Sequence, residues 1–222
     1  MKKIFFVFAV CCVAITATAD VVRVNSFKQN NSAYQKETAK VRDLTKKSSE
    51  IGEGSCPFAI NFLPGIQIPN ENWDIFLFRI NILVGRQNNV FGFDSASIGN
   101  EVKNNFIGVQ SAGIYNKIGY SDGALQVAGM LNRSLGDFYG VQVASFVNFT
   151  EGKMTGLQVA IVNSATTLDG VQIGLLNLAQ AGSGVQIGIW NSAKNFEGLQ
   201  IGLGNYNEGS SLEFFPIMNL GF

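Results

Sequence analysis

A phrase of fixed form recurs through the second half of the chain and limits the possible folds more than any other feature. It consists of glycine, an apolar residue, glutamine, a short run of small and apolar residues, and then asparagine. Its glutamines are Gln110, Gln126, Gln142, Gln158, Gln172, Gln186 and Gln200, spaced by 16, 16, 16, 14, 14 and 14 residues. Its asparagines are Asn116, Asn132, Asn148, Asn163, Asn177, Asn191, Asn205 and Asn219. A fixed period of this length indicates one structural unit repeated in tandem.

The repeat extends one copy beyond each end of the glutamine series. Asp94 replaces glutamine before Asn100, and Phe214 replaces it before Asn219. We therefore count nine copies between about residue 92 and residue 222, with atypical copies at the ends, as is common in repeat proteins. Because side-chain amides both donate and accept hydrogen bonds along a stack, we expect the glutamines and asparagines to be structural rather than ligand-binding.

Apolar and polar or small residues alternate through each copy, which is typical of a β-strand. In the copy at 170–179, the alternation puts Val171, Ile173 and Asn177 on one face and Gln172 and Gly174 on the other. In the earlier copies asparagine follows glutamine by six residues instead of five. That change would move the asparagine to the opposite face, so we expect a β-bulge to absorb the extra residue.

The alternation favours an antiparallel transmembrane β-barrel in which each copy is one strand. Ten residues at about 3.3 Å each span about 33 Å, or about 23 Å when tilted near 45°, close to the roughly 25 Å apolar band of an outer-membrane wall. Nine repeat strands and two or three from the segments 58–68 and 73–84 give eleven or twelve, and twelve is the even number typical of such barrels. The chain also ends on Phe222 with apolar residues at alternating positions, similar to the last strand of such barrels.

The alternative is a β-solenoid, in which each copy is one coil and the amides stack into ladders inside it. The solenoid explains the identity of the repeated residues better. Against it, a 14-residue coil has to turn, and ten residues of unbroken alternation would then cross a corner. The sequence therefore favours an all-β fold of 14–16-residue repeats, with the barrel ahead of the solenoid.

The sequence divides into three regions. Residues 1–19 have the form of a secretory signal peptide, with Lys2 and Lys3 before a short apolar run and an A-x-A site that ends at Ala19. Residues 20–56 form a polar leader, and residues 57–222 form the β-repeat domain. We therefore expect export to the outer membrane or cell surface, or else to the periplasm or medium.

Composition excludes most catalytic and binding chemistry. The chain has no histidine, which rules out histidine-based triads and zinc sites that use imidazole. Lys and Arg balance Asp and Glu at 16 each, so no basic field for nucleic acid is present. Cys56 is the one cysteine after the predicted signal peptide, and no base is positioned to activate it. We expect no catalytic residues, no metal and no cofactor.

The phrases at 170–179 and 184–193 resemble those of bacterial surface-repeat proteins of spirochaetes and Bacteroidetes, over about residues 58–222. That family has no established activity, so the resemblance implies no catalytic or binding residues. The expected function is a non-enzymatic structural protein of the outer membrane or cell surface, and a narrow passive channel is one role for such a barrel. The alternative is a solenoid that acts as an adhesion or interaction module toward a host or envelope protein or glycan.

Overall fold

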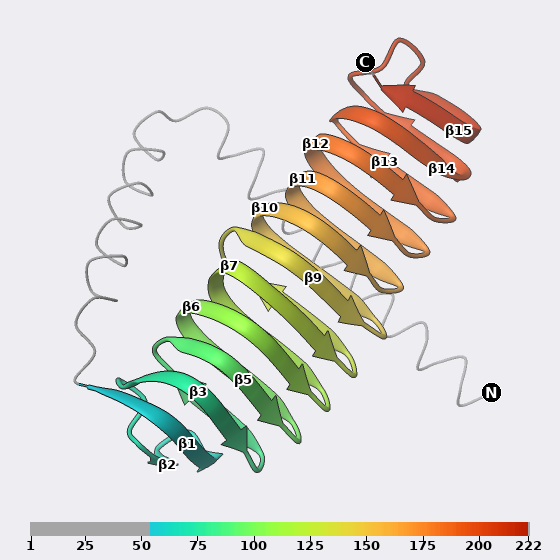
Figure 1. The fold of residues 1–222 in the computed structure, drawn as a ribbon. Helices are drawn as coiled ribbons and strands as arrows, with labels where there is room; N and C mark the ends of the chain where they lie inside the picture. The colour runs from blue at the N-terminus through green and yellow to red at the C-terminus, as the bar shows by residue number, and fades with distance from the viewer. Residues whose placement is uncertain (1–53, 222) are drawn as a thin grey trace, which may run out of the picture. The chain divides into compact units, whose positions relative to one another are not determined.

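The computed structural model describes residues 54–221, which form a β-solenoid of about ten turns (Figure 1). The predicted signal peptide and residues 20–53 of the predicted leader lie outside the described residues. No membrane-spanning helix occurs between residues 54 and 221. The strands are β1 (Ser55–Leu63), β2 (Ile66–Ile68), β3 (Asp74–Asn81), β4 (Val84–Gln87), β5 (Val90–Ala96), β6 (Gly99–Ala112), β7 (Tyr115–Ala128), β8 (Leu131–Ser134), β9 (Phe138–Ala144), β10 (Val147–Val159), β11 (Val162–Ile173), β12 (Leu176–Ile187), β13 (Trp190–Ala193), β14 (Asn195–Asn207) and β15 (Phe214–Gly221).

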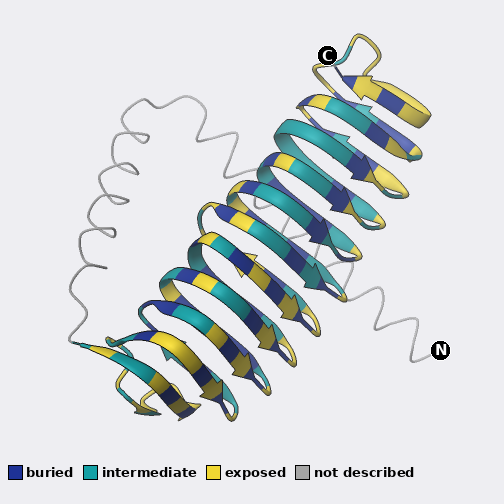
Figure 2. Cartoon of the chain, viewed as in Figure 1, coloured by how far each residue is buried: buried dark blue, intermediate teal, exposed yellow. Residues whose placement is uncertain are grey.

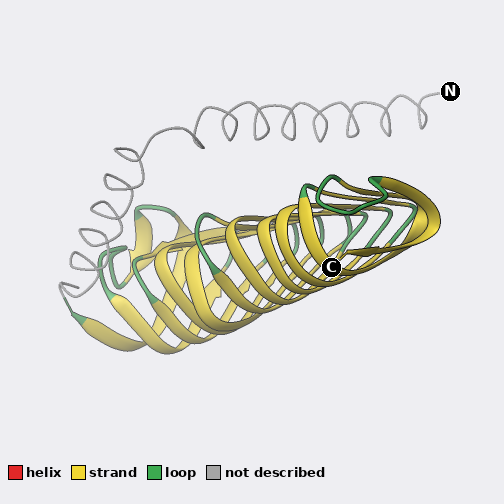
Figure 3. Cartoon of the chain, turned by 90° about the horizontal axis from the view of Figure 1, so that it is seen from above, coloured by secondary structure: helices red, strands yellow, loops and turns green. Residues whose placement is uncertain are grey.

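The prediction of a barrel is wrong, and the direction of strand pairing shows why. From β3 to β14 every pairing is parallel, and each copy lies beside the same residues of the next copy, so that Asn163 stands opposite Asn177 and Gln172 opposite Gln186. A parallel neighbour one repeat further along requires the chain to complete a full turn within each repeat. Figure 3 shows these successive turns as a stack of strands and loops without a helix.

Each coil has two walls joined by one tight turn and one broad curve. We call the stretch around each glutamine the Gln wall and the stretch around each asparagine the Asn wall. A two-residue bend, Gly113 and Ile114 in one coil, joins the Gln wall to the Asn wall of the next coil. The broad curve returns the chain to the Gln wall within one continuous strand, as in β6 and β7. The alternation seen in the sequence therefore does cross a corner, at the tight turn.

The tight turn also explains why glutamine and asparagine point the same way. Gln172 and Asn177 are both fully buried, as are Gln110 and Asn116, whether five or six residues separate them. The prediction that Gln172 and Asn177 face opposite sides is therefore wrong. The predicted β-bulge is wrong too, because the bend has two residues in both kinds of copy, at 145–146 and at 174–175, and the extra residue of the longer copy is Ala144 at the end of β9. The second extra residue of the 16-residue copies lies in the broad curve, where the register shifts between Thr150 and Lys153.

Apolar side chains fill the inside of the broad curve. Most are the fourth residue before a glutamine: Phe106, Phe138, Met154, Leu168 and Phe196, all buried. Two positions before the glutamine, every coil of the glutamine series but one has glycine. Gly156 has φ +129°, and a Cβ there would collide with the carbonyl oxygen of Gly140 in the preceding coil. Close stacking at this point therefore favours glycine, and Ala124 is the exception.

The ends of the solenoid depart from the parallel pattern. At the N-terminal end β2 folds back antiparallel onto β1, through a turn that contains Pro64 and Gly65. At the C-terminal end β15 folds back antiparallel onto β14. The last predicted copy is therefore not a coil, and Asn219 stands opposite Gln200 instead of continuing the asparagine stack. An antiparallel strand at this end pairs an edge that would otherwise be open to another chain.

Candidate functional site

The seven repeat glutamines form one continuous hydrogen-bonded ladder inside the solenoid. Each Nε2 donates to the Oε1 of the glutamine one coil earlier, over 2.7 to 2.9 Å from Gln126 to Gln186 and 2.8 Å at Gln200. All seven side chains are buried. A buried amide without a partner would destabilise the fold by about 1–3 kcal/mol, so in-register stacking is what makes these residues tolerable.

The asparagines form a second ladder of opposite polarity. Each Nδ2 donates to the Oδ1 of the asparagine one coil later, from Asn61 through Asn81 and Asn100 to Asn205, over 2.6 to 3.0 Å. In most coils Nδ2 also donates to the backbone carbonyl of the residue after the glutamine, as Asn163 does to Ile173 at 2.8 Å. Asparagine therefore ties each tight turn to the next coil. Asn219 lies outside this ladder and donates to the carbonyl of Leu212.

The glutamine ladder ends on a buried ion pair on its N-terminal side. Asp94 accepts from Gln110 at 2.7 Å, from Asn81 at 2.9 Å, and from Arg79 through both carboxylate oxygens at 2.8 and 2.5 Å. Asp94 takes the ladder position that the repeat predicted for it. Sequence reasoning missed Arg79, Asn81 and Asn61, because asparagine spacings of 20 and 19 residues break the period. At the other end, Gln200 Oε1 accepts no hydrogen bond from the described residues.

The outer side of the Gln wall carries no charged side chain on either side of the glutamines. Burial alternates along each coil (Figure 2). Each repeat glutamine is buried, and the residues on either side of it are more exposed. We define the apolar face by three rows. The residues before the glutamine position are Phe58, Phe78, Phe93, Val109, Leu125, Val141, Leu157, Val171, Val185, Leu199 and Leu220. The residues after it are Ile60, Ile80, Ser95, Ser111, Val127, Val143, Val159, Ile173, Ile187, Ile201 and Met218. The tight turns add Ile98, Ile114, Met130, Phe146, Ile161, Leu175, Ile189 and Leu203.

The side chains of the apolar face remain open to solvent. Ile173 is 40% exposed, Leu175 51% and Phe93 56%. At the N-terminal end the rings of Phe58, Phe78 and Phe93 stack on one another, with centroids 6.1 and 5.7 Å apart. The largest apolar patch on a typical monomer covers about 300–600 Å² and is often functional. A face that runs the full length of the solenoid is therefore the strongest candidate for a binding surface.

The outer side of the Asn wall is different, because charged residues occupy its N-terminal half. Arg86 and Glu101 pair at 2.7 Å, and the Tyr115 hydroxyl donates to Glu101 at 3.0 Å. Burial of the phenol and the adjacent Glu101 carboxylate raise the pKa of Tyr115 to about 12. The hydrogen bond and charge of Glu101 also raise the pKa of Arg86. Arg133 pairs with Glu151 at 2.5 Å further along the solenoid.

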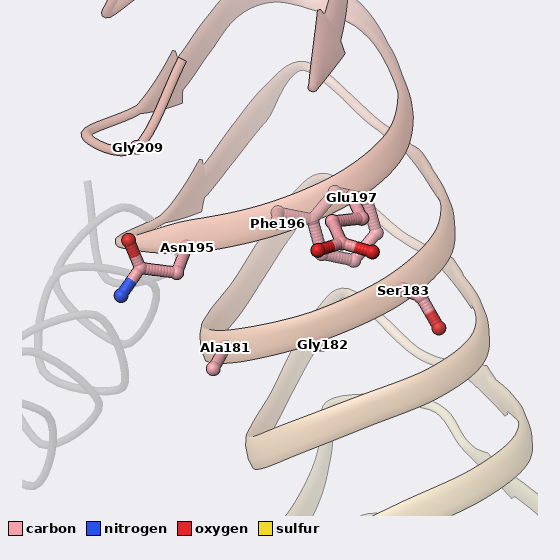
Figure 4. A pocket seen from close by; sticks show the side chains of 7 residues that line it. All are labelled: Ala181, Gly182, Ser183, Asn195, Phe196, Glu197 and Gly209. Carbon is pink, nitrogen blue, oxygen red and sulfur yellow. The ribbon is translucent and has the colours of Figure 1, made fainter. Parts of the chain in front are cut away.

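A hollow of about 530 Å³ lies in the broad curve near the C-terminal end (Figure 4). It forms beside Gly182, which stands between Leu168 and Phe196 in the strip of core side chains and contributes no side chain of its own. Ser183, Asn195 and Glu197 line it, and Glu197 is the one ionisable residue among its lining residues. A single exposed carboxylate without a base or nucleophile beside it is not a catalytic arrangement.

Within residues 54–221, no three histidine, cysteine, aspartate or glutamate residues gather in a way that could hold a metal ion. Cys56 lies in β1, is partly exposed, and donates from Sγ to the carbonyl of Phe58 at 3.1 Å. Its surroundings include no positioned base in the described part of the chain. No protein-family model, curated protein or solved structure matches the sequence.

Proposed function

We propose that this chain is a non-enzymatic interaction module of the bacterial cell envelope, which binds its partner through the apolar face. The observation that carries the proposal is the contrast in the Gln wall between a hydrogen-bonded amide ladder inside and an uncharged, exposed exterior. A solenoid needs apolar residues inside to fold, but it gains nothing from apolar residues outside unless something covers them.

The envelope assignment depends on the N-terminal sequence. Lys2 and Lys3, the apolar run after them and the A-x-A site at Ala19 support export. The repeat phrase supports a place among surface-repeat proteins of spirochaetes and Bacteroidetes, as the resemblance implies. The proposal departs from the channel role first expected. The two ladders and the core strip of a solenoid fill its interior, whereas a channel needs an open lumen.

The test is retention of the protein in the cell envelope of a Gram-negative host that expresses the chain with its own N-terminal sequence. The informative variant is Ile173→Glu, which places a carboxylate on the eighth of the eleven strands that form the apolar face. The matched control is Ser192→Glu, which places the same charge on the outer side of the Asn wall. Neither position contributes a side chain to a ladder, so both variants should fold.

We expect the wild type and Ser192→Glu to stay with the envelope fraction after a high-salt wash and Ile173→Glu to be released. High salt weakens charged contacts and leaves apolar contacts intact, so retention would identify the apolar face as the binding surface. Equal behaviour of the two glutamate variants would contradict a role for the apolar face. Retention of the unprocessed chain in the cytoplasm would contradict the envelope assignment.

A further inference from the structure

The apolar face continues without a break from the first strand to the last. At the C-terminal end Leu220 and Met218 of β15 pair with Leu199 and Ile201, so the antiparallel cap extends the same surface. At the N-terminal end Phe58 and Ile60 of β1 extend it in the other direction. We propose that this face is covered by a second copy of the chain, with the two Gln walls packed face to face. The inference rests on the proposed function and names the partner as a second copy, so envelope retention then requires the dimer.

The dimensions of the face fit a protein dimer. Eleven strands at about 4.8 Å spacing give a length of about 48 Å, and three rows across the wall and turn give a width of about 15 Å. The product is roughly 700 Å², close to the roughly 800 Å² that each partner buries in a standard protein interface. Parallel sheets with β-branched side chains are flat enough to pack at about 10 Å from one another.

The chemistry of the face fits a copy of itself. Its rows hold valine, leucine, isoleucine, methionine and phenylalanine, and Ser95 and Ser111 are its two hydroxyl residues. No charge would be desolvated where two such faces meet around a twofold axis. A twofold contact uses the same patch on both copies and needs no complementary partner surface. An uncharged apolar patch meets this condition, because it is complementary to itself.

A membrane surface is the competing occupant, and the charges disfavour it. Proteins that lie on anionic bilayers surround an apolar face with lysine and arginine. Residues 54–221 carry seven lysine and arginine residues against eleven aspartate and glutamate residues, a net charge of −4. On the curve side of the apolar face, the exposed residues Asp169 and Glu197 lie in one register row. Asp169 pairs with Lys153 at 2.9 Å, so this border presents no excess of basic side chains to anionic lipid.

The experiment is sedimentation equilibrium of the purified chain, with Ile173→Glu and the control Ser192→Glu, from about 1 to about 100 µM. We expect the wild type and Ser192→Glu to sediment as dimers. Ile173→Glu should raise the dimer Kd at least about 100-fold, because a carboxylate inside the interface would be buried without a partner. Circular dichroism of all three proteins should show the same β-signal, which separates loss of the dimer from loss of the fold.

Two further results would overturn the second copy as partner. One is a wild type that stays monomeric at about 100 µM. Binding of that monomer to vesicles of phosphatidylethanolamine and phosphatidylglycerol, lost in Ile173→Glu, would make lipid the occupant. The other is a dimer that Ile173→Glu leaves intact, which would place the interface elsewhere. If the wild type is monomeric but Ile173→Glu still loses envelope retention, the proposed function survives and only the dimer fails.

Discussion

The two walls of the solenoid are alike inside and different outside. Inside, each carries one buried amide ladder, and the two ladders run with opposite polarity. Outside, the Gln wall is apolar from end to end, whereas the Asn wall has ion pairs over its N-terminal half. The amide positions therefore specify the stacking, while the outer positions are free to serve another purpose. Four predictions test this division, the largest effect first.

Asp94→Ala should have the largest effect, because it removes the carboxylate from a buried pair and leaves Arg79 without a counter-ion, hydrogen-bonded to the carbonyl of Glu101 alone. We expect the free energy of unfolding to fall by about 3–5 kcal/mol in chemical denaturation. The double variant Arg79→Gln with Asp94→Gln converts the pair into two ladder amides, and its loss should be less than half as large. An equal loss in both variants would mean that the ladder does not continue to this end.

Removal of an interior amide should have the next largest effect. Loss of an asparagine should destabilise the fold more than loss of a glutamine. Gln158→Ala removes donation to Gln142 and acceptance from Gln172, and we expect a loss of about 2–4 kcal/mol. Asn163→Ala also leaves the Ile173 carbonyl without its side-chain donor, so its loss should be about 1 kcal/mol greater. The outward control Val159→Thr should stay within about 0.5 kcal/mol. A control as damaging as Gln158→Ala would contradict the inside-outside assignment.

The ion pairs of the Asn wall should contribute little to stability. Arg133 and Glu151 are 44% and 38% exposed at their side chains, so solvent screens their attraction. We expect Arg133→Ala to lower the free energy of unfolding by less than about 1 kcal/mol, with a smaller difference at about 1 M salt. A salt-independent loss above about 2 kcal/mol would show that the wall is stabilised by its charges.

The smallest effect is confined to alkaline pH. The pKa of Tyr115 is raised to about 12, so the folded state holds the phenol proton more tightly than the unfolded chain. The resulting stability is fully present below the ordinary tyrosine pKa of about 10 and is lost as the pH rises to about 12. When the absorbance titration of Tyr115→Phe is subtracted from that of the wild type, the difference should show one tyrosine that ionises at unusually high pH. Glu101→Gln should bring its midpoint down, and an unchanged midpoint would exclude the carboxylate as a cause.

The sequence identified the structurally important residues better than it predicted the path of the backbone. The spacing of the glutamines and asparagines identified the amide positions, and Asp94 was assigned to the glutamine ladder that it ends. The path was misread because the tight turn at Gly174 and Leu175 contains no proline, asparagine or aspartate, so the alternation continues through it. Once that turn is recognised, glutamine and asparagine point inward at either spacing.

Other features have only a weak or interrupted pattern in the sequence. The core strip has an interrupted one: an apolar residue stands four positions before most glutamines, but Asp122 and Gly182 break the series. Arg79 and Asn81 lie in coils of irregular length, where the period gives no register. The apolar face could not be separated from a lipid-facing barrel wall, since both produce the same alternation of side chains. Only the parallel pairing distinguishes the two.

The most direct test of the in-register coil stack is the distance between spin labels on the outer side of the Asn wall. The labels would replace Lys117 and Ser192, or Lys117 and Tyr206, with Cys11, Cys12 and Cys56 changed to serine and the sample diluted with unlabelled protein. Five and six coil steps at about 4.8 Å predict distances near 24 and 29 Å, so one more coil should add about one strand spacing. Distances that do not lengthen with each coil would contradict the solenoid and the two walls derived from it.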